Sequence, residues 1–220
     1  MRCLVGEALN ERVRLDDKPL LTLVVEQPNI YFAICSFAYL GFRGRKELLK
    51  VVEDDQVLEP EYIENIFWPD LNTKKNLNAL YKRLKQFGSE ELDSKLKEIR
   101  EKMESIVLDI SMDFDGELTC EGDIKAEELF KMFDLRFSDE ADDGLMRFVK
   151  CISISHELLK TSVFCVRGLH QCFCNEQLEQ LTKELSYKKI NLISIESNAP
   201  SEIVASESLL IIDKDLCIIS

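Results

Sequence analysis

Carboxylate side chains gather in residues 111–128, which read SMDFDGELTCEGDIKAEE. Their oxygens suit Ca²⁺, which takes about 6–8 oxygen ligands and tolerates irregular geometry. The stretch does not fit an EF-hand: when Gly116 is aligned with the loop glycine, Gly122 takes the twelfth position, which requires a glutamate. Two interpretations stay open, a calcium site of another kind or a solvated acidic loop, and the loop is the more common outcome for such runs.

Basic side chains gather just before this stretch, in residues 71–88, with no acid among them. They are Lys74, Lys75, Lys82, Arg83 and Lys85. On a helix, one-sided cations could follow the phosphates of a DNA backbone, although lysines opposite a leucine seam usually just face water. No interleaving of aromatic and basic residues suggests base stacking, so single-strand binding is disfavoured. We expect duplex binding without sequence readout.

The formal net charge of −13 does not exclude a nucleic-acid partner, because the acid is unevenly distributed. Residues 109–143 hold thirteen acidic side chains against three basic ones. The chain is therefore electrically polarised, and its overall charge is a poor guide to its partners.

A second set of candidate metal ligands, His170, Cys172 and Cys174, lies close together in CVRGLHQCFC. Zinc sites usually pair two C-x2-4-C knuckles, so a single C-x-C favours ordinary thiols. The eight cysteines lie mostly in apolar settings, where a reduced thiol acts as a small hydrophobe. No signal peptide is evident, and no apolar run approaches the roughly 18–20 residues of a membrane span, so we expect a cytoplasmic protein without a membrane partner.

Nucleotide catalysis is not expected. A phosphate loop after the first strand would need G-x4-G-K-[ST], but the corresponding VVEQPNIYF has neither glycine nor lysine. Its proline also lacks a backbone N–H. The two histidines give little support for acid–base chemistry, and His156 is expected to be structural. We therefore predict a protein that is not an enzyme, with no catalytic residues.

Both ends of the chain are predicted to form an α/β structure, which must position the candidate functional residues. Apolar runs predict strands over 20–26, 161–168 and 190–197, and a helix over 174–189 capped by Asn175 makes the last two strands a βαβ crossover. Hairpins are predicted around Asp54 and Asp55 and at 213–215. The run 30–42 is apolar almost all round, which predicts a buried helix.

The middle of the chain has a helical period instead. Apolar residues step by three and four on both sides of Gly88 and Ser89, which predicts an antiparallel helical hairpin. Helices are also predicted over 125–133 and 142–160. The expected organisation is an α/β head, residues 1–70 plus 155–220, carrying an α-helical leg, residues 71–154.

Three stretches together resemble the type II-A CRISPR-associated "Csn-two" family, whose members take part in spacer acquisition, the adaptation step of bacterial immunity. They are DLNTKKNLNALYKRL, the acidic stretch running into IKAEELFKMFDLRF, and the closing LLIIDKDLCII. The order of elements matches over essentially the whole chain. Each motif is loose alone, and the specificity comes from their order and spacing together.

This resemblance implies a degenerate P-loop-kinase-like α/β head with an inserted α-helical leg. It also implies a homotetrameric ring, stabilised by calcium, whose basic hole encloses double-stranded DNA ends. Its partners would be other CRISPR adaptation proteins and the guide-RNA effector nuclease. The candidate calcium ligands are Asp113, Asp115, Glu117, Glu121, Asp123 and Glu128. The candidate DNA-binding residues are Arg43, Arg45, Lys46, Lys74, Lys75, Lys82, Arg83 and Lys85.

Two other interpretations compete with this one. A P-loop-like nucleotide enzyme, or a degenerate nucleotide-binding protein without DNA-binding activity, would be stabilised thermally by ATP. A helical interaction module, free of metal and DNA, would keep the same mass in solution in EDTA and in Ca²⁺.

Overall fold

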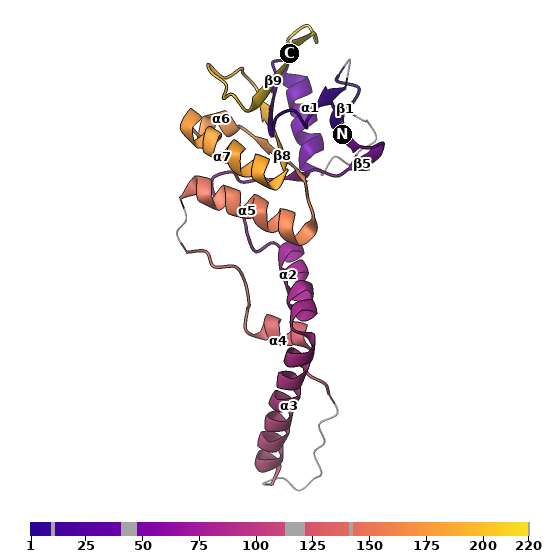
Figure 1. Cartoon of the computed structure of the whole chain (residues 1–220), viewed down its shortest axis with the longest axis vertical. Coiled ribbons are helices and arrows are strands. Elements are labelled where there is room, and N and C mark those ends of the chain that lie inside the picture. Colours follow the sequence, from indigo (N-terminus) through magenta and orange to yellow (C-terminus); the bar gives the residue numbers. More distant parts are fainter. Residues whose placement is uncertain (10–11, 41–47, 113–121, 141–142, 220) are drawn as a thin grey trace. The chain divides into compact units, whose positions relative to one another are not determined.

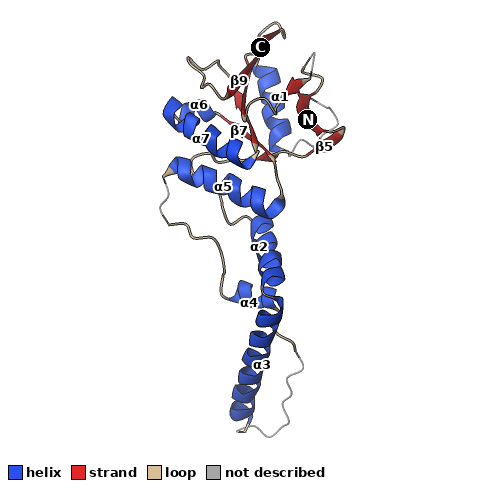
Figure 2. Ribbon diagram, viewed as in Figure 1, coloured by secondary structure: helices blue, strands red, loops and turns tan. Residues whose placement is uncertain are grey.

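Figure 1 shows the chain as a computed structural model that describes residues 1–9, 12–40, 48–112, 122–140 and 143–219, without the side chains of residues 89 and 90. The chain divides into two compact units. One consists of Met1–Leu71 and Glu140–Ser220, and the other of Asn72–Asp139. Among the described residues, strands occur in the first unit only, as the colouring of Figure 2 shows.

A six-stranded sheet forms the centre of the first unit, in the order β10-β9-β3-β8-β7-β6. Neighbouring strands are parallel except at the edge, where β10 returns antiparallel to β9. This confirms the predicted buried strands, the βαβ crossover and the closing hairpin. The strands are β3 (Leu20–Val25), β6 (Glu61–Tyr62), β7 (Val163–Arg167), β8 (Asn191–Glu196), β9 (Glu207–Ile212) and β10 (Ile218–Ile219).

A second, four-stranded antiparallel sheet has the order β2-β1-β4-β5. The turn between β4 and β5 consists of Asp54 and Asp55, whose φ angles of 48° and 66° are left-handed. Two such residues are typical of the tight turns that match strand twist, and this confirms the predicted hairpin. The strands are β1 (Arg2–Val5), β2 (Val13–Arg14), β4 (Lys50–Glu53) and β5 (Gln56–Leu58).

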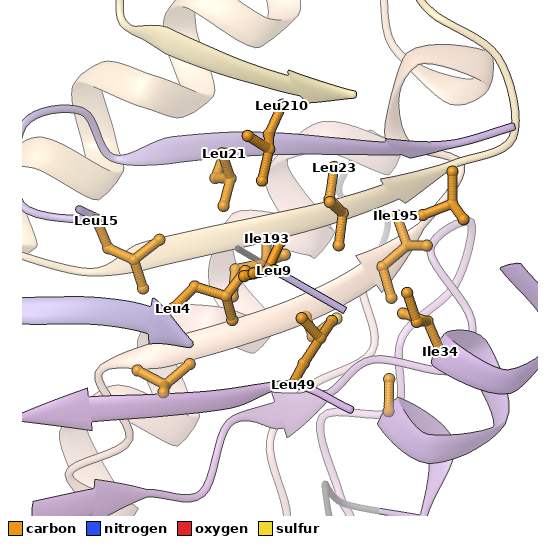
Figure 3. Packing of buried hydrophobic residues seen from close by; sticks show 14 of the residues in the cluster. Leu4, Leu9, Leu15, Leu21, Leu23, Ile34, Leu49, Ile193, Ile195 and Leu210 are labelled. Carbon is orange, nitrogen blue, oxygen red and sulfur yellow. The ribbon is translucent and has the colours of Figure 1, made fainter. Parts of the chain in front are cut away.

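Each face of the large sheet buries its own hydrophobic core, because side chains alternate along a strand. On one face, Leu23 of β3 and Ile195 of β8 pack with Ile34 of α1 (Pro28–Tyr39). Figure 3 shows these side chains beside Leu4 and Leu49, which the small sheet and its flank contribute. The small sheet and α1 therefore share one face of the large sheet.

The opposite face is covered by α5 (Gly144–Leu159) and α7 (Asn175–Lys188). Phe148 and Ile152 of α5 are 0 % and 1 % exposed there. The predicted leg, residues 71–154, thus ends too late, because α5 belongs to the first unit. Amphipathic spacing indicates that a helix has an apolar face but not which surface covers it. A further small correction concerns α7, which begins at Asn175 and is preceded by the capping residue Cys174.

Helix α1 is only partly the buried helix that its composition predicts. Ile34, Phe37 and Ala38 are buried, but Phe32 and Tyr39 are 73 % and 59 % exposed. The helix therefore has two apolar sides, and the sheet covers one of them.

In the second unit, the predicted antiparallel hairpin is wrong. Helices α2 (Lys74–Phe87) and α3 (Ser89–Ser111) follow one another through Gly88, as Figure 1 shows. Gly88 N donates to Leu84 O at 3.2 Å, and Gly88 O accepts from Leu92 N at 2.7 Å, so the helical pattern continues. A glycine reverses the chain when it turns left-handed, but Gly88 has φ −109° and ψ 17°.

The short helix α4 (Ala126–Met132) packs beside α2 instead. The rings of Tyr81 and Phe130 have centroids 5.7 Å apart, and the Tyr81 hydroxyl donates to Leu135 O at 2.8 Å. The first residue of the unit also contacts a residue near its end. Asn72 Nδ2 donates to Phe137 O at 3.1 Å, and Phe137 N donates to Asn72 Oδ1 at 2.8 Å.

Candidate nucleic-acid interface

The lysines of α2 lie on one side of that helix. At about 100° per residue, one arc of about 100° holds Lys74, Lys75, Asn78, Lys82 and Lys85, and all five are exposed. The leucines of the helix lie outside this arc. We call these four lysines the basic arc. Their spacing is set by the helix itself, so the predicted sidedness of the cations holds in the structure.

The first turn of α2 carries positive charge at an unfavourable place. Thr73 caps the helix by accepting from Asn76 N at 3.2 Å, and no acidic residue follows in the first turn. Lys74 and Lys75 therefore stand at the positive end of the helix dipole, where a cation costs roughly 0.3–1 kcal/mol. Helix stability does not account for these two lysines. They concentrate positive potential where an anion would be attracted.

A groove of about 630 Å³ runs along the basic arc within the second unit. Lys82 and Lys85 line it from α2, and Lys131 lines it from α4. Two carboxylates, Asp93 and Glu127, also line it, so its charge is mixed. Lys131 was missed by the sequence reasoning, which counted it only among the few cations of the acidic segment. The contact between Tyr81 and Phe130 brings its helix to this position.

The remaining candidate DNA-binding residues are placed differently. Arg83 lies outside the basic arc, with its guanidinium carbon 5.4 Å from the centroid of the Phe87 ring. It is half-buried and holds a cation–π contact there. The other three candidates lie outside the described residues: Arg43, Arg45 and Lys46.

Two of the six candidate calcium ligands are described. Asp123 pairs with Arg100 of α3, which also donates from Nε to Glu104 Oε1 at 2.8 Å. Glu128 lies 3.9 Å from Lys125 Nζ. The other four candidates lie outside the described residues: Asp113, Asp115, Glu117 and Glu121.

The donor chemistry of this segment suits Ca²⁺, but the described carboxylates do not converge. Within residues 1–9, 12–40, 48–112, 122–140 and 143–219, no three His, Cys, Asp or Glu side chains gather closely enough to hold a metal. Arg100 competes with a cation for the Asp123 carboxylate.

The predicted apolar seam of α3 is largely exposed. Met103, Ile106 and Ile110 are 54 %, 56 % and 61 % exposed. Such a stripe is typical of a surface that another chain covers. In the part of the chain that is described, only Leu96 of this helix is buried.

The connection between β3 and α1 is the position of a phosphate loop in nucleotide-binding α/β folds. It consists of Glu26 and Gln27, and Pro28 then starts the helix. Gln27 Oε1 accepts from Ile30 N at 2.7 Å, so the side chain uses a donor that a phosphate would need. A glycine-rich cradle has no room in two residues.

The two histidines have hydrogen-bonding partners, and the described cysteines are free thiols. His156 Nδ1 lies 2.7 Å from Thr161 O, which fits its expected structural role. His170 Nε2 lies 2.7 Å from Glu207 Oε1. The seven described cysteines are free thiols, and burial raises the pKa of the Cys151 thiol to about 12. In the described ranges, neither Cys172 nor Cys174 joins His170 in a group that could hold zinc.

The chain matches a family model and is similar to solved structures, one of which is described below. The model of the family described as CRISPR-associated protein (Cas_Csn2) matches residues 43–216. No curated protein matches the chain. One similar solved structure is a putative metal-chelate-type ABC transporter in an inward-facing conformation, with 10 % sequence identity and a TM-score of 0.46. The match covers 99 % of this chain and 82 % of the transporter chain. None of the described helices combines the length and apolar character of a membrane crossing.

Proposed function

The chain belongs to the Csn2 family of CRISPR-associated proteins, and from this we propose that it serves CRISPR adaptation by binding the ends of double-stranded DNA. The observation that carries the proposal is the basic arc of α2, four exposed lysines on one side of a helix that has no acid in its first turn. Lysines spaced along a helix can contact phosphates without reading base edges. Binding is therefore non-sequence-specific, and the protein acts in the cytoplasm.

The DNA-binding form is a homotetrameric ring. Repetition by symmetry turns one basic arc into a continuous basic surface, which a single net-acidic chain does not offer. The exposed apolar stripe of α3, with Met103, Ile106 and Ile110, supports an association of chains, because water-exposed apolar surface of this kind favours burial.

Calcium stabilises the ring through carboxylates of the acidic segment, of which Asp123 and Glu128 are the described members. Neutralising these carboxylates removes repulsion between them and from nearby DNA. The donor set supports this, since Ca²⁺ prefers carboxylate oxygens. Arg100 pairs with Asp123 and is therefore an internal competitor of the ion.

The head is a degenerate relative of P-loop kinases and is not an enzyme. The parallel order of β9, β3, β8 and β7 supports the kinship with P-loop kinases. The two-residue connection before Pro28 supports the absence of enzymatic activity. The proposed partners are other CRISPR adaptation proteins and the guide-RNA effector nuclease, which the family's role in adaptation brings together with this chain.

Two measurements test the proposal, each in Ca²⁺ and in EDTA: mass in solution by light scattering, and mobility shifts with linear and closed circular duplexes of equal length. We expect the mass of four chains in Ca²⁺ and tighter binding to the linear duplex. Equal binding to linear and circular DNA would refute end recognition. Unchanged mass and absent DNA binding in both conditions would favour the helical interaction module.

A further inference from the structure

A second concave site lies in the first unit, between α1 and the carboxyl ends of β6 and β7. Its volume is about 530 Å³, within the size range of ligand pockets, roughly 300–1,000 Å³. Phe32, Tyr39 and Leu40 line it from α1 and its end, and Tyr62, Glu64 and Arg167 line it from the strand ends. We call it the α1 pocket.

The pocket lies where α/β sheets bind ligands, outside the carboxyl ends of parallel strands. Tyr62 pairs with Cys165 in the parallel register of β6 and β7, and Arg167 is the last residue of β7. Gly168 then turns the chain with φ +76° and donates from N to Ile195 O at 3.1 Å. Glycine suits this left-handed position, and the turn leaves Arg167 exposed at the pocket.

Exposed aromatic surface of α1 lines this pocket beside the half-buried Tyr62, which also packs against the core. Tyr39 and Tyr62 meet edge to face, with ring centroids 6.2 Å apart and planes at 78°. Phe32 is 73 % exposed on the same helix side, while Ile34 fills the core from the other side. Exposed rings of this kind stack on nucleic-acid bases, whatever the base.

The electrostatics of the pocket favour one anionic group. Among its described lining residues, Arg167 is the one cation and Glu64 the one carboxylate. The charge of Arg167 lowers the pKa of Tyr62 against the larger upward effect of burial. It acts in the same direction on the Cys35 thiol, whose pKa burial also raises. A guanidinium suits a phosphate.

We propose that the α1 pocket binds one unpaired nucleotide, with its base against the rings of Phe32, Tyr39 and Tyr62 and its phosphate on Arg167. The sequence pattern gave no sign of this base-stacking site. Its rings and its arginine come from three separate segments that only the fold brings together.

Such a nucleotide has two sources: a free mononucleotide, or an unpaired nucleotide of a DNA strand. The second source rests on the proposed DNA-binding function, and the first does not. Calorimetric titrations of the full chain with deoxyadenosine monophosphate and with a single-stranded dA trinucleotide separate them. Comparable binding of both assigns the site to free nucleotides, and binding of the trinucleotide alone assigns it to DNA strands.

The variants Tyr39→Ala and Arg167→Gln should each lower the affinity for the bound probe by about tenfold. Tyr187→Ala is the matched control, because Tyr187 is 86 % exposed on α7 of the same unit and does not line the pocket. Lys183→Gln is the corresponding charge control, since Lys183 is exposed on α7. Both controls should bind as the native chain does.

Three results would overturn the proposal. The first is that neither probe binds to the native chain, and the second is that the pocket variants bind as tightly as Tyr187→Ala. The third is that the light-scattering mass of Tyr39→Ala falls while its nucleotide binding is unchanged, which would make the pocket a subunit contact. The doubly substituted Lys82→Gln, Lys85→Gln chain should keep nucleotide binding. Its duplex affinity reports separately on the proposed function, so the two proposals can fail independently.

Discussion

His170 Nε2 lies 2.7 Å from Glu207 Oε1 inside the first unit, and Glu207 is 0 % exposed. Thr22 donates its hydroxyl to the same carboxylate oxygen, and Val204 N donates to Oε2 at 3.2 Å. A second buried carboxylate, Glu196, accepts from His170 N at 3.2 Å. These contacts join the helix after β7 to the start of β9, across the strands between them.

This pair makes the stability of the first unit depend on pH. The hydrogen bond that His170 donates to Glu207 raises the pKa of His170, against the downward effect of burial, and the charges of Glu207 and Glu196 raise it further. The pair's stabilisation is thus fully present below the unfolded pKa of about 6.5 and is lost as pH rises through the higher folded pKa. His170→Gln should cost about 1–3 kcal/mol at pH 6 and less at pH 9.

Urea unfolding of the native chain and of His170→Gln at both pH values measures this difference. A gap between the two proteins that stays constant from pH 6 to pH 9 would show that His170 carries no charge in the folded chain.

The basic arc should determine how DNA affinity depends on salt. The slope of log affinity against log salt is negative, and each lost phosphate contact reduces its magnitude by about 0.9. Lys82→Gln and Lys85→Gln should each show this decrease with a linear duplex of any sequence. Arg83→Gln is the control on the same helix, because Arg83 lies over Phe87 outside the arc. An Arg83 variant that changes the slope as much as the lysine variants would place the DNA on a different side of α2.

The pairing of Arg100 with Asp123 should oppose calcium binding. Exposed ion pairs contribute about 0.2–1 kcal/mol, so Arg100→Gln should tighten Ca²⁺ binding by roughly 1.4- to 5-fold. Calorimetric titration with CaCl₂ measures the change, and Asp123→Asn should weaken binding instead. Lys95→Gln provides the control, since Lys95 pairs with Glu91 elsewhere on α3. Unaltered affinity in both the Arg100 and Asp123 variants would exclude Asp123 from the ligand set.

Two glycines should respond in opposite ways to alanine. A Cβ at Gly6 would overlap the backbone carbonyl of Leu48, which cannot move aside as a flexible side chain can. Gly6→Ala should therefore destabilise the first unit by about 1–3 kcal/mol. Gly144 opens α5 with no atom near its would-be Cβ, so Gly144→Ala should stabilise by about 0.4–1 kcal/mol. Urea midpoints measure both, and a destabilising Gly144→Ala would contradict this account of the helix start.

Much of the fold could be predicted from the sequence because the relevant signals are local. The buried runs that became β3, β7 and β8 and the turn at Asp54 and Asp55 depend on near neighbours only. The errors concern which surface an element meets. Gly88 looked like a chain reversal, yet its φ is negative and it keeps helical hydrogen bonds to Leu84 and Leu92. The apolar seam of α3 is therefore exposed and does not pack against α2.

The candidate site divides in the same way. Lys74 and Lys85 share one helix, so their common side follows from spacing alone. Lys131 and the arginine of the α1 pocket reach their sites through packing of segments far apart in the sequence. Asp123 could be chosen as an oxygen donor by its residue type, but its pairing with Arg100 depends on the fold.

The two hydrogen bonds between Asn72 and Phe137 have a consequence for how this architecture can change over evolution. The helical segment leaves and returns through neighbouring points, so its removal or exchange requires only a short connection, whose closure costs little entropy. The segment can lengthen, shorten or be replaced without any strand of the α/β unit being re-threaded. It is a natural cassette for grafting between relatives.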